Sequence, residues 1–343
     1  DACFANCNML GAEVNDTHTA GESTYSQELA PLVDDLESRG IAEPSDGALI
    51  VRLDELGIKE PLLVRKSDGG FLYATTDLAG IRRRVDKLSA DRVIYAVDAR
   101  QGLHFRQVFA ASRRADYTKR DEQDIELMHA AFGTVLGEDG RPFKTRSGEN
   151  VKLSDLLEEA VRRADEVVKE KNPDLAEDER RKIAWAVGIG AIKYADLSTE
   201  RIKDYVFAFD RMLAFEGNTG PYLQYAAVRV SSIFRKAESE HGISAGADLG
   251  AYALNEPEEK AIALQLLRYA GVVQSAVELC EPHRLCTYLY ELASAFSTFF
   301  NACPVLKAPN EGTRNSRLRL CRLTGNVLRD GLRSIGIVPL EKM

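Results

Sequence analysis

The stretch RMLAFEGNTGPYLQYAAVRVSSI, from Arg211 to Ile233, is the most specific wording in the chain. Three turn-forming residues, Gly217, Asn218 and Gly220, come directly before Pro221. Proline suits the first turn of a helix, because the N–H that it lacks would have no partner there. The apolar residues that follow recur at helical spacing. We therefore expect a turn, a helix that begins near Gly220, and a docking partner at this junction.

Four further stretches are comparably specific. They are YATTDLAGI (Tyr73 to Ile81), VDARQGLHFRQVF (Val97 to Phe109), RPFKTRSG (Arg141 to Gly148) with VKLSDLLEEA (Val151 to Ala160), and EPHRLCTYLYELASAFSTFFNACPVLKA (Glu281 to Ala308). Each resembles a part of the arginyl-tRNA synthetases, class I enzymes that join arginine to its tRNA, and the parts occur in the same order. The resemblance covers nearly the whole chain. It is weakest over residues 1–60, where only Gly21 to Tyr25 looks familiar.

One feature of that family is missing from the sequence. Class I synthetases carry a HIGH-like sequence in the first half of their nucleotide-binding fold, whereas none of the five histidines here stands in an H-x-G-H setting. The chain also opens at Asp1, without an initiator methionine. We therefore expect the C-terminal part of a larger synthetase, and we expect this part alone to form no arginyl-adenylate.

The resemblance implies an α/β fold followed by an all-α one. Residues 1–61 would be a partial connective insertion, and residues 62–203 the second half of a Rossmann-like nucleotide-binding fold. Residues 204–343 would be a helical anticodon-binding bundle. The hydrophobic pattern agrees, because short apolar runs alternate with helical runs between about 62 and 136, which is typical of βαβ units with parallel strands.

The pattern also predicts individual elements. Strands are expected at 48–53, 62–64, 71–74, 93–97 and 127–136. Helices are expected at 26–38, 78–88, 105–115, 154–170, 177–196, 220–239, 255–280, 283–302 and 313–335. Ser154 is placed to cap its helix, and Asn255 with Glu258 resembles a capping box.

Bulk composition sets outer limits. A length of 343 residues suggests two or three domains, and 45% hydrophobic with 29% charged residues is ordinary for a globular protein. No apolar run approaches the ~20 residues that a membrane-spanning helix needs. The six cysteines form no C-x-x-C pair, and four of them lie in helical stretches. We expect those four to be buried free thiols, and we expect a cytoplasmic protein with no membrane contact.

The net charge of −8 argues against indiscriminate binding to nucleic acid. Arginines nevertheless crowd the last helical stretch, at Arg314, Arg317, Arg319, Arg322, Arg329 and Arg333. They form either a solvated helix face or a basic stripe for RNA. An acidic protein with basic stripes suits a selective partner.

A guanidinium is best met by a carboxylate, which accepts two parallel hydrogen bonds from it. Asp77 is the candidate, because we expect it to follow a strand at Phe71–Ala74 and to open a helix at the ligand-binding edge of the sheet. In the family, the residues that match Tyr73 and Asp77 line the arginine pocket, and the glutamine that matches Gln101 helps to hold the amino acid. Spacing alone would favour Asp77 as an acid of the first helical turn and Tyr73 as a core residue.

His104 and Phe105 stand in the same stretch as Gln101. A lone histidine at a helix start is usually structural or solvated. Here the resemblance implies that the pair contacts ATP near the adenosine.

The segment from Lys144 to Gly148 occupies the place of the family's KMSKS loop. Adenylate formation builds negative charge on the α-phosphate and the leaving pyrophosphate, which cations on a loop can stabilise. Lys144 and Arg146 are therefore the catalytic candidates. The second lysine of the motif is absent, so Arg146 cannot simply be given its role, and a basic surface turn is the alternative. Magnesium is expected to accompany the ATP.

RNA loops are recognised by stacking on aromatic rings and by hydrogen bonds to base edges. Most aromatic residues of the helical part recur at core spacing. Only Tyr222, Gln224 and Tyr225 stand in a stretch whose family counterpart begins the tRNA-binding bundle, and none is assigned to a particular base.

The resemblance implies an arginine–tRNA ligase with arginine, ATP and tRNA(Arg) as substrates, which acts as a monomer at full length. One alternative is a non-catalytic tRNA-binding protein derived from a synthetase. Another is the helical anticodon domain of a different class I synthetase, which Tyr73 beside Asp77 and the GNTGPYLQY wording disfavour.

Overall fold

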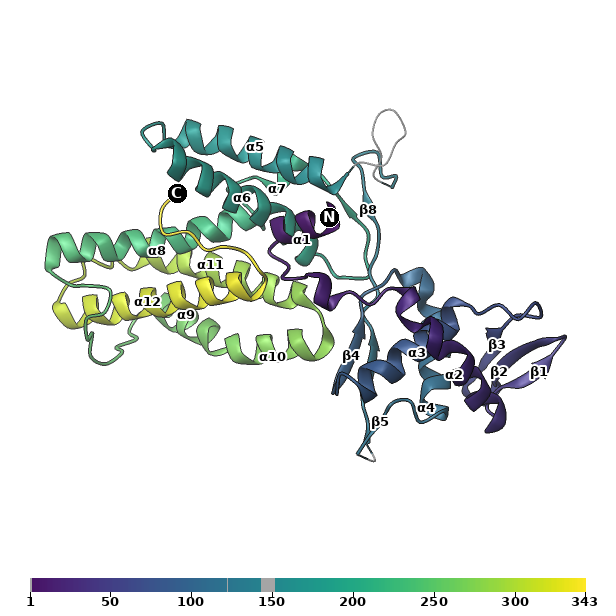
Figure 1. Ribbon diagram of the computed structural model, residues 1–343. Coiled ribbons are helices and arrows are strands. Elements are labelled where there is room, and N and C mark those ends of the chain that lie inside the picture. The colour runs from purple at the N-terminus through teal and green to yellow at the C-terminus, as the bar shows by residue number, and fades with distance from the viewer. Residues whose placement is uncertain (1, 122, 143–151) are drawn as a thin grey trace. The chain divides into compact units, whose positions relative to one another are not determined.

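The computed structural model describes residues 2–121, 123–142 and 152–343, and it divides into two compact units (Figure 1). Residues 15–133 form one unit, here called the sheet unit. Residues 1–14 and 134–343 form the other, here called the bundle unit. Each unit has a hydrophobic core of its own residues. The three-segment division made from the sequence stays a prediction.

The sheet unit mixes helices with short strands. Its α-helices are α2 (Ser26–Ser38), α3 (Tyr73–Asp86) and α4 (Gly102–Arg114), with 3-10 turns η1 (Asp16–His18), η2 (Glu22–Tyr25), η3 (Asp54–Leu56) and η4 (Ala99–Gln101). Its strands are β1 (Glu43–Ser45), β2 (Ala48–Leu53), β3 (Ile58–Arg65), β4 (Arg92–Tyr95), β5 (Lys119–Arg120), β6 (Gln123–Asp124) and β7 (Glu126–His129).

Only part of this unit has the expected parallel arrangement. Strands β4 and β7 pair in parallel and are joined through α4, so they form one βαβ unit. Strand β3 instead pairs antiparallel with β2, which pairs antiparallel with β1. The prediction of a parallel strand at 62–64 is therefore wrong in orientation. Helices α3 and α4 both pack against β3.

The predicted strand at Phe71–Ala74 is wrong. Phe71 makes one isolated bridge to Arg65, and α3 begins two residues later at Tyr73. The hydroxyl of buried Thr75 donates a hydrogen bond to the backbone oxygen of Val64, 2.5 Å away, and so ties the first turn of α3 to β3. This tertiary contact favours a helix where the apolar run alone suggested a strand.

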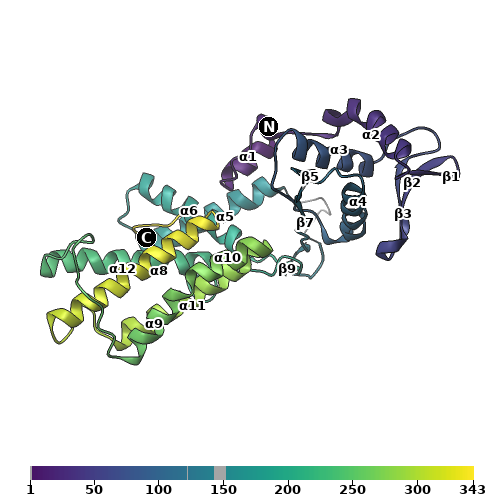
Figure 2. The same cartoon turned by 90° about the horizontal axis from the view of Figure 1, so that it is seen from below.

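The bundle unit is mainly helical. Its helices are α1 (Ala2–Met9), α5 (Leu153–Lys171), α6 (Glu177–Leu197), α7 (Phe209–Met212), α8 (Gly220–His241), α9 (Pro257–Leu267), α10 (Tyr269–Leu279), α11 (Pro282–Ala302) and α12 (Glu311–Ser334). Strands β8 (Val135–Leu136) and β9 (Tyr205–Val206) pair in parallel. The long helices α8, α11 and α12 run side by side in both views (Figures 1 and 2).

The helix predicted at 255–280 is two helices, α9 and α10, which meet at Arg268. No glycine or proline marks the break. The backbone oxygen of Gln265 accepts the N–H of Arg268 and the hydroxyl of Tyr288. That oxygen would bond the N–H of Tyr269 in an uninterrupted helix, so a contact from α11 accompanies the break.

Both predicted caps are corrected. Lys152 is the N-cap of α5, and Ser154 lies inside the helix, where its hydroxyl bonds the neighbouring Asp155. The capping box of α9 is one residue later than expected and uses Glu256 and Glu259. Capping depends on the backbone angles of a single residue, which the sequence specifies only to within a position or two.

Helix α8 begins at Gly220 as predicted, and the junction packs on α6. The hydroxyl of Tyr194 donates to Asn218 at 2.6 Å, and the amide of buried Gln224 donates to the backbone oxygen of Ala186 at 3.1 Å. Between them, Gly220 lies against Gly190. The three contacted residues of α6 are four positions apart and so share one face of that helix.

Replacing Gly220 by alanine is expected to lower the free energy of unfolding by about 1–3 kcal/mol. A Cβ atom would stand 2.7 Å from the backbone oxygen of Gly190 and 3.1 Å from the Cβ of Tyr194. The matched control is Gly271→Ala in α10, where a Cβ meets nothing within 4 Å, and which should stabilise by roughly 0.5–1 kcal/mol. Urea unfolding followed through Trp185, the only tryptophan, measures both. Equal shifts of the two midpoints would contradict the prediction.

The cysteines of the bundle unit are free, and three of them are buried, as expected for Cys286, Cys303 and Cys321. Cys280, also expected to be buried, is partly exposed. Its backbone is left-handed, with φ of +50°, at the end of α10. Because Cys280 follows the last residue of α10 in this conformation, its side chain does not reach the core.

Alkylation at neutral pH should modify exposed Cys3 readily and leave Cys286 and Cys321 intact until the protein is unfolded. Burial raises the pKa of both buried thiols to about 12, so almost no reactive thiolate is present. Mass spectrometry of peptides alkylated with and without urea checks this. Modification of Cys321 at the rate of Cys3 in the native protein would count against it.

Four of the six arginines in the last helical stretch make contacts inside the bundle unit. Arg317 pairs with buried Glu259, and Arg319 lies 4.3 Å over the ring of Tyr252. Arg322 and Arg329 donate to residues of neighbouring segments. Most of the arginines of this helix therefore contact neighbouring segments of the bundle unit. They form neither a purely solvated face nor a purely RNA-binding stripe.

Candidate functional site

Two helices of the sheet unit bring Asp77 and His104 together. Asp77 lies in the second turn of α3 and His104 in the first turn of α4, and the two helices pack on each other. The Oδ2 atom of Asp77 is 2.7 Å from Nε2 of His104. The side chains are 29% and 26% exposed, so the pair is supported by the protein and still open to a ligand. The sequence named both residues but did not predict their contact.

Tyr73 is the first residue of α3 and is 73% exposed. It precedes Asp77 by one helical turn, and the two side chains therefore lie on the same face of the helix. Its exposure excludes the alternative of a core tyrosine. An exposed ring beside a half-open carboxylate can cover the flat face of a bound guanidinium.

Gln101 is exposed and forms the N-cap position of α4, after the end of β4. The turn before Gln101 is held by Asp98, which was not predicted from the sequence. The side chain of Asp98 accepts hydrogen bonds from the backbone N–H and the guanidinium of Arg100. These bonds from Arg100 hold the pKa of Asp98 at about 2. An aspartate just after a strand and before a helix is a typical helix cap, and this pattern could have identified Asp98 from the sequence.

Phe105 points into the core of the sheet unit and is 4% exposed. Its ring centroid lies 4.8 Å from that of Tyr95 and 4.7 Å from that of His129. The ring therefore anchors the first turn of α4, which carries His104. Direct contact between Phe105 and ATP stays a prediction.

Tyr95 and His129 were not predicted from the sequence. Burial raises the pKa of Tyr95 to about 12 although Arg84 acts in the opposite direction, so the phenol stays protonated. The Nε2 atom of His129 lies 3.0 Å from the backbone oxygen of Val97. Both residues lie at the carboxyl ends of the paired strands β4 and β7, the edge where α/β proteins bind ligands.

Lys144 and Arg146 lie outside the described residues. Their predicted roles in the loop therefore rest on the sequence.

The three residues named in α8 differ in accessibility. Gln224 is fully buried and bonds the backbone oxygens of Ala186 and Val338. Tyr222 is partly buried against Tyr290, with 5.8 Å between ring centroids. Tyr225 is 48% exposed. Gln224 therefore holds the fold together, and Tyr225 is the ring open to a partner.

Comparison with known proteins now places these segments. Residues 5–209 match the family model described as the catalytic domain of class I (R) tRNA synthetases. The chain belongs to the class I arginyl-tRNA synthetase family. Residues 223–343 match the DALR anticodon binding domain. The docked turn Gly217–Gly220 lies between the two matches.

Relatives support the same assignment. The chain is 52% identical to the arginine–tRNA ligase of Frankia casuarinae, over 97% of this chain and 56% of that protein. It is 50% identical to that of Shewanella amazonensis, over 97% of this chain and 57% of that protein. The solved arginyl-tRNA synthetase of Plasmodium falciparum superposes with a TM-score of 0.85 at 29% identity, over 100% of this chain and 56% of the other. The chain thus spans little more than half the length of these relatives.

These matches confirm the predicted fold class, an α/β class I catalytic part followed by a helical anticodon-binding bundle. They also favour the arginyl family over another class I synthetase. Within the described part of the chain, no helix is both long enough and apolar enough to cross a membrane.

Proposed function

We propose that this chain supplies the arginine-binding and tRNA-binding parts of an arginine–tRNA ligase. In that reaction arginine and ATP give arginyl-adenylate and pyrophosphate, and the arginyl group then passes to the terminal adenosine of tRNA(Arg) with release of AMP. The observation that carries the proposal is the partly exposed carboxylate of Asp77, one helical turn after the exposed ring of Tyr73. The high identity to arginine–tRNA ligases supports it.

Asp77 is suited to the side chain of arginine. The contact with His104 uses Oδ2 and leaves Oδ1 for a guanidinium N–H. A guanidinium remains charged at physiological pH, so it needs a fixed countercharge when water is removed from it. Gln101, exposed at the start of α4, can both donate and accept hydrogen bonds, which suits the amino and carboxylate groups of the substrate.

ATP is the expected second substrate. His104 would contact its adenosine part, and buried Phe105 would hold His104 in place. Lys144 and Arg146 would stabilise the charge that develops on the phosphates. The described residues contain no group of three or more His, Cys, Asp or Glu that could hold a metal. Magnesium would arrive on the phosphates of ATP, which is its usual mode of binding.

The bundle unit would bind tRNA(Arg). Exposed Tyr225 offers a ring on which a base can stack. Free thiols among the described cysteines favour a reducing compartment, and we propose a cytoplasmic enzyme. We further propose that the full-length protein is a monomer.

Arginine-dependent exchange between ATP and pyrophosphate tests the proposal. The assay uses the gene product that contains these 343 residues, with and without tRNA(Arg). Exchange that responds to arginine and not to lysine supports the ligase. If the protein binds tRNA(Arg) and shows no exchange, the non-catalytic tRNA-binding alternative replaces it.

Replacing Lys144 by alanine should lower kcat for activation and leave the KM for arginine nearly unchanged. An interaction that forms mainly in the transition state has this signature. Pyrophosphate exchange at saturating ATP measures it, with Lys152→Ala as the control outside the loop. An unchanged kcat would remove Lys144 from the proposed mechanism.

A further inference from the structure

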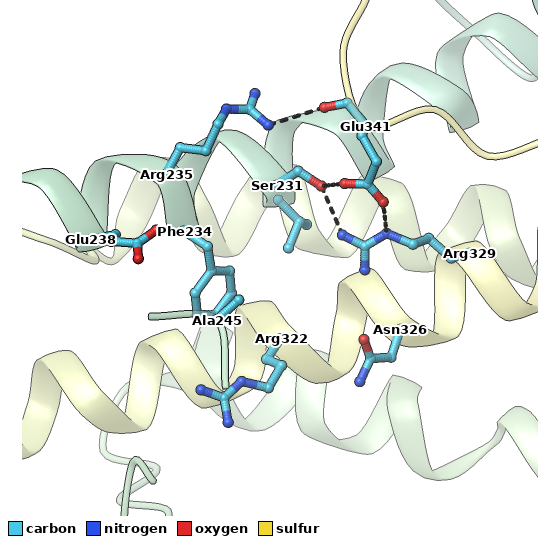
Figure 3. A pocket seen from close by; sticks show the side chains of 10 residues that line it. Ser231, Phe234, Arg235, Glu238, Ala245, Arg322, Asn326, Arg329 and Glu341 are labelled. Carbon is cyan, nitrogen blue, oxygen red and sulfur yellow. Dashed lines mark hydrogen bonds and ion pairs between the residues drawn. The ribbon is translucent and has the colours of Figure 1, made fainter. Parts of the chain in front are cut away.

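A pocket of about 380 Å³ lies in the bundle unit between α8 and α12 (Figure 3). Three arginines line it, Arg235 from α8 and Arg322 and Arg329 from α12. Val230 and Phe234 of α8 supply an apolar wall. Its two acidic lining residues leave an excess of one positive charge, so the pocket favours an anion.

A carboxylate of the chain itself already lines the pocket and contacts its cationic groups. Ser231 donates a hydrogen bond to Oε2 of Glu341 at 2.7 Å, and Nε of Arg329 lies 3.4 Å from Oε1 (Figure 3). Arg329 also donates to the hydroxyl of Ser231 at 2.8 Å, so these two residues form one connected group. Arg235 donates to the backbone oxygen of Glu341.

The contacts of the Glu341 side chain stabilise its position only weakly. Its side chain is 70% exposed, although Arg329 is only 18% exposed. Glu341 lies in the segment after α12, which has no helix or strand. Ion pairs with one exposed partner contribute little, typically below about 1 kcal/mol. Another anion can therefore replace the carboxylate without the loss of a helix.

The guanidiniums have unused capacity. The Nε atom of Arg322 is buried and makes no hydrogen bond within the described part of the chain, and the Nε atom of Arg329 makes only the 3.4 Å ion pair with Glu341. Buried donors without partners are uncommon and indicate a missing ligand or water. Arginine forks match the oxygens of phosphate, and a pocket of this size is larger than one carboxylate needs.

We infer that the α8–α12 pocket is a phosphate-binding site in which Glu341 is an exchangeable occupant. Ser231 and Arg329 hold the phosphate oxygens, Arg235 closes the α8 side, and the wall of Val230 and Phe234 limits access of water. The phosphate belongs either to a small free anion or to the backbone of an RNA strand. The site does not depend on the proposed ligase activity.

Titration of the chain with inorganic phosphate and with pyrophosphate, by calorimetry at constant ionic strength, tests the inference. A short single-stranded RNA without a terminal phosphate is the second probe. Glu341→Gln removes the competing charge and should tighten binding of at least one probe about tenfold. Adding Arg329→Gln or Arg235→Gln to that variant should reverse the gain. Arg235 is exposed, so its replacement is expected to leave α8 folded.

Matched controls are Glu240→Gln, on exposed α8 surface outside the pocket, and Arg333→Gln, one turn beyond Arg329 on α12. Tighter binding of phosphate or pyrophosphate identifies a free anion, and tighter binding of RNA alone identifies the phosphodiester. The inference is overturned if Glu341→Gln binds no probe more tightly than the unchanged chain. It is equally overturned if the controls shift affinity as much as the pocket variants.

Discussion

Glu259→Gln is expected to lower the free energy of unfolding by about 3–5 kcal/mol. The carboxylate of Glu259 is 0% exposed and lies 2.7 Å from Nε of Arg317, which is itself buried. It also accepts the backbone N–H groups of Asn255 and Glu256. Glutamine keeps the size of the side chain and removes its charge, so the guanidinium of Arg317 would stay buried without a countercharge.

The double variant Glu259→Leu with Arg317→Met is the control. Replacing both members of a buried ion pair by apolar residues is often neutral or stabilising. Urea unfolding followed through Trp185 reports on the bundle unit, which contains that residue. If the double variant is as unstable as Glu259→Gln, lost packing rather than an unpaired charge explains the effect.

The same pair makes stability depend on pH in acid. Burial opposes ionisation of Glu259, but hydrogen bonds from Glu256, Arg317 and Asn255 outweigh it and lower the pKa. A lowered pKa in the folded state stabilises the protein above the unfolded value, about 4.3, and the contribution is lost as the pH falls towards the folded value. Glu259→Gln should therefore reduce this acid dependence.

Asp77→Asn is expected to raise the KM for arginine by a factor corresponding to about 2–5 kcal/mol, which is thirtyfold or more. The KM for ATP should change far less. Asparagine keeps the acceptor that faces His104 but removes the charge that a guanidinium requires. This prediction rests on the proposed ligase activity, and steady-state pyrophosphate exchange with each substrate varied in turn measures it.

Asp86→Asn is the matched control, because Asp86 is an exposed aspartate at the other end of the same helix. It should leave both KM values unchanged. Equal increases for arginine and ATP in Asp77→Asn would assign Asp77 to the support of His104 instead of the arginine side chain.

Periodicity predicted the long elements well, because their residues repeat one pattern over many positions. Helix α2 and strand β2 have the predicted bounds, and α8, α11 and α12 differ by only one or two residues at most of their ends. Short segments were predicted less well. At Phe71–Ala74, four residues fit a strand as readily as a helix, and the bond from Thr75 to Val64 favours the helix.

The candidate site was predicted residue by residue and not as an arrangement. Tyr73, Asp77, Gln101 and His104 were named from two separate stretches of sequence. Tyr95 and His129 were missed because a buried phenol and a ring contact leave no pattern in the sequence. Asp98 was missed although an aspartate between a strand and a helix is a recognisable cap signal.

The sequence by itself determined the family and the order of the α/β and helical parts, because motifs and periodicity are properties of neighbouring positions, and it supplied the prediction that Asp77 meets arginine. Only the tertiary structure decided what those residues contact. Gln224 became a buried link between α6 and Val338, Arg317 the partner of Glu259, and Asp77 the partner of His104. The physical reason is that hydrogen bonds and ion pairs act over a few ångströms, and the partners are brought that close by the packing of helices far apart in the sequence.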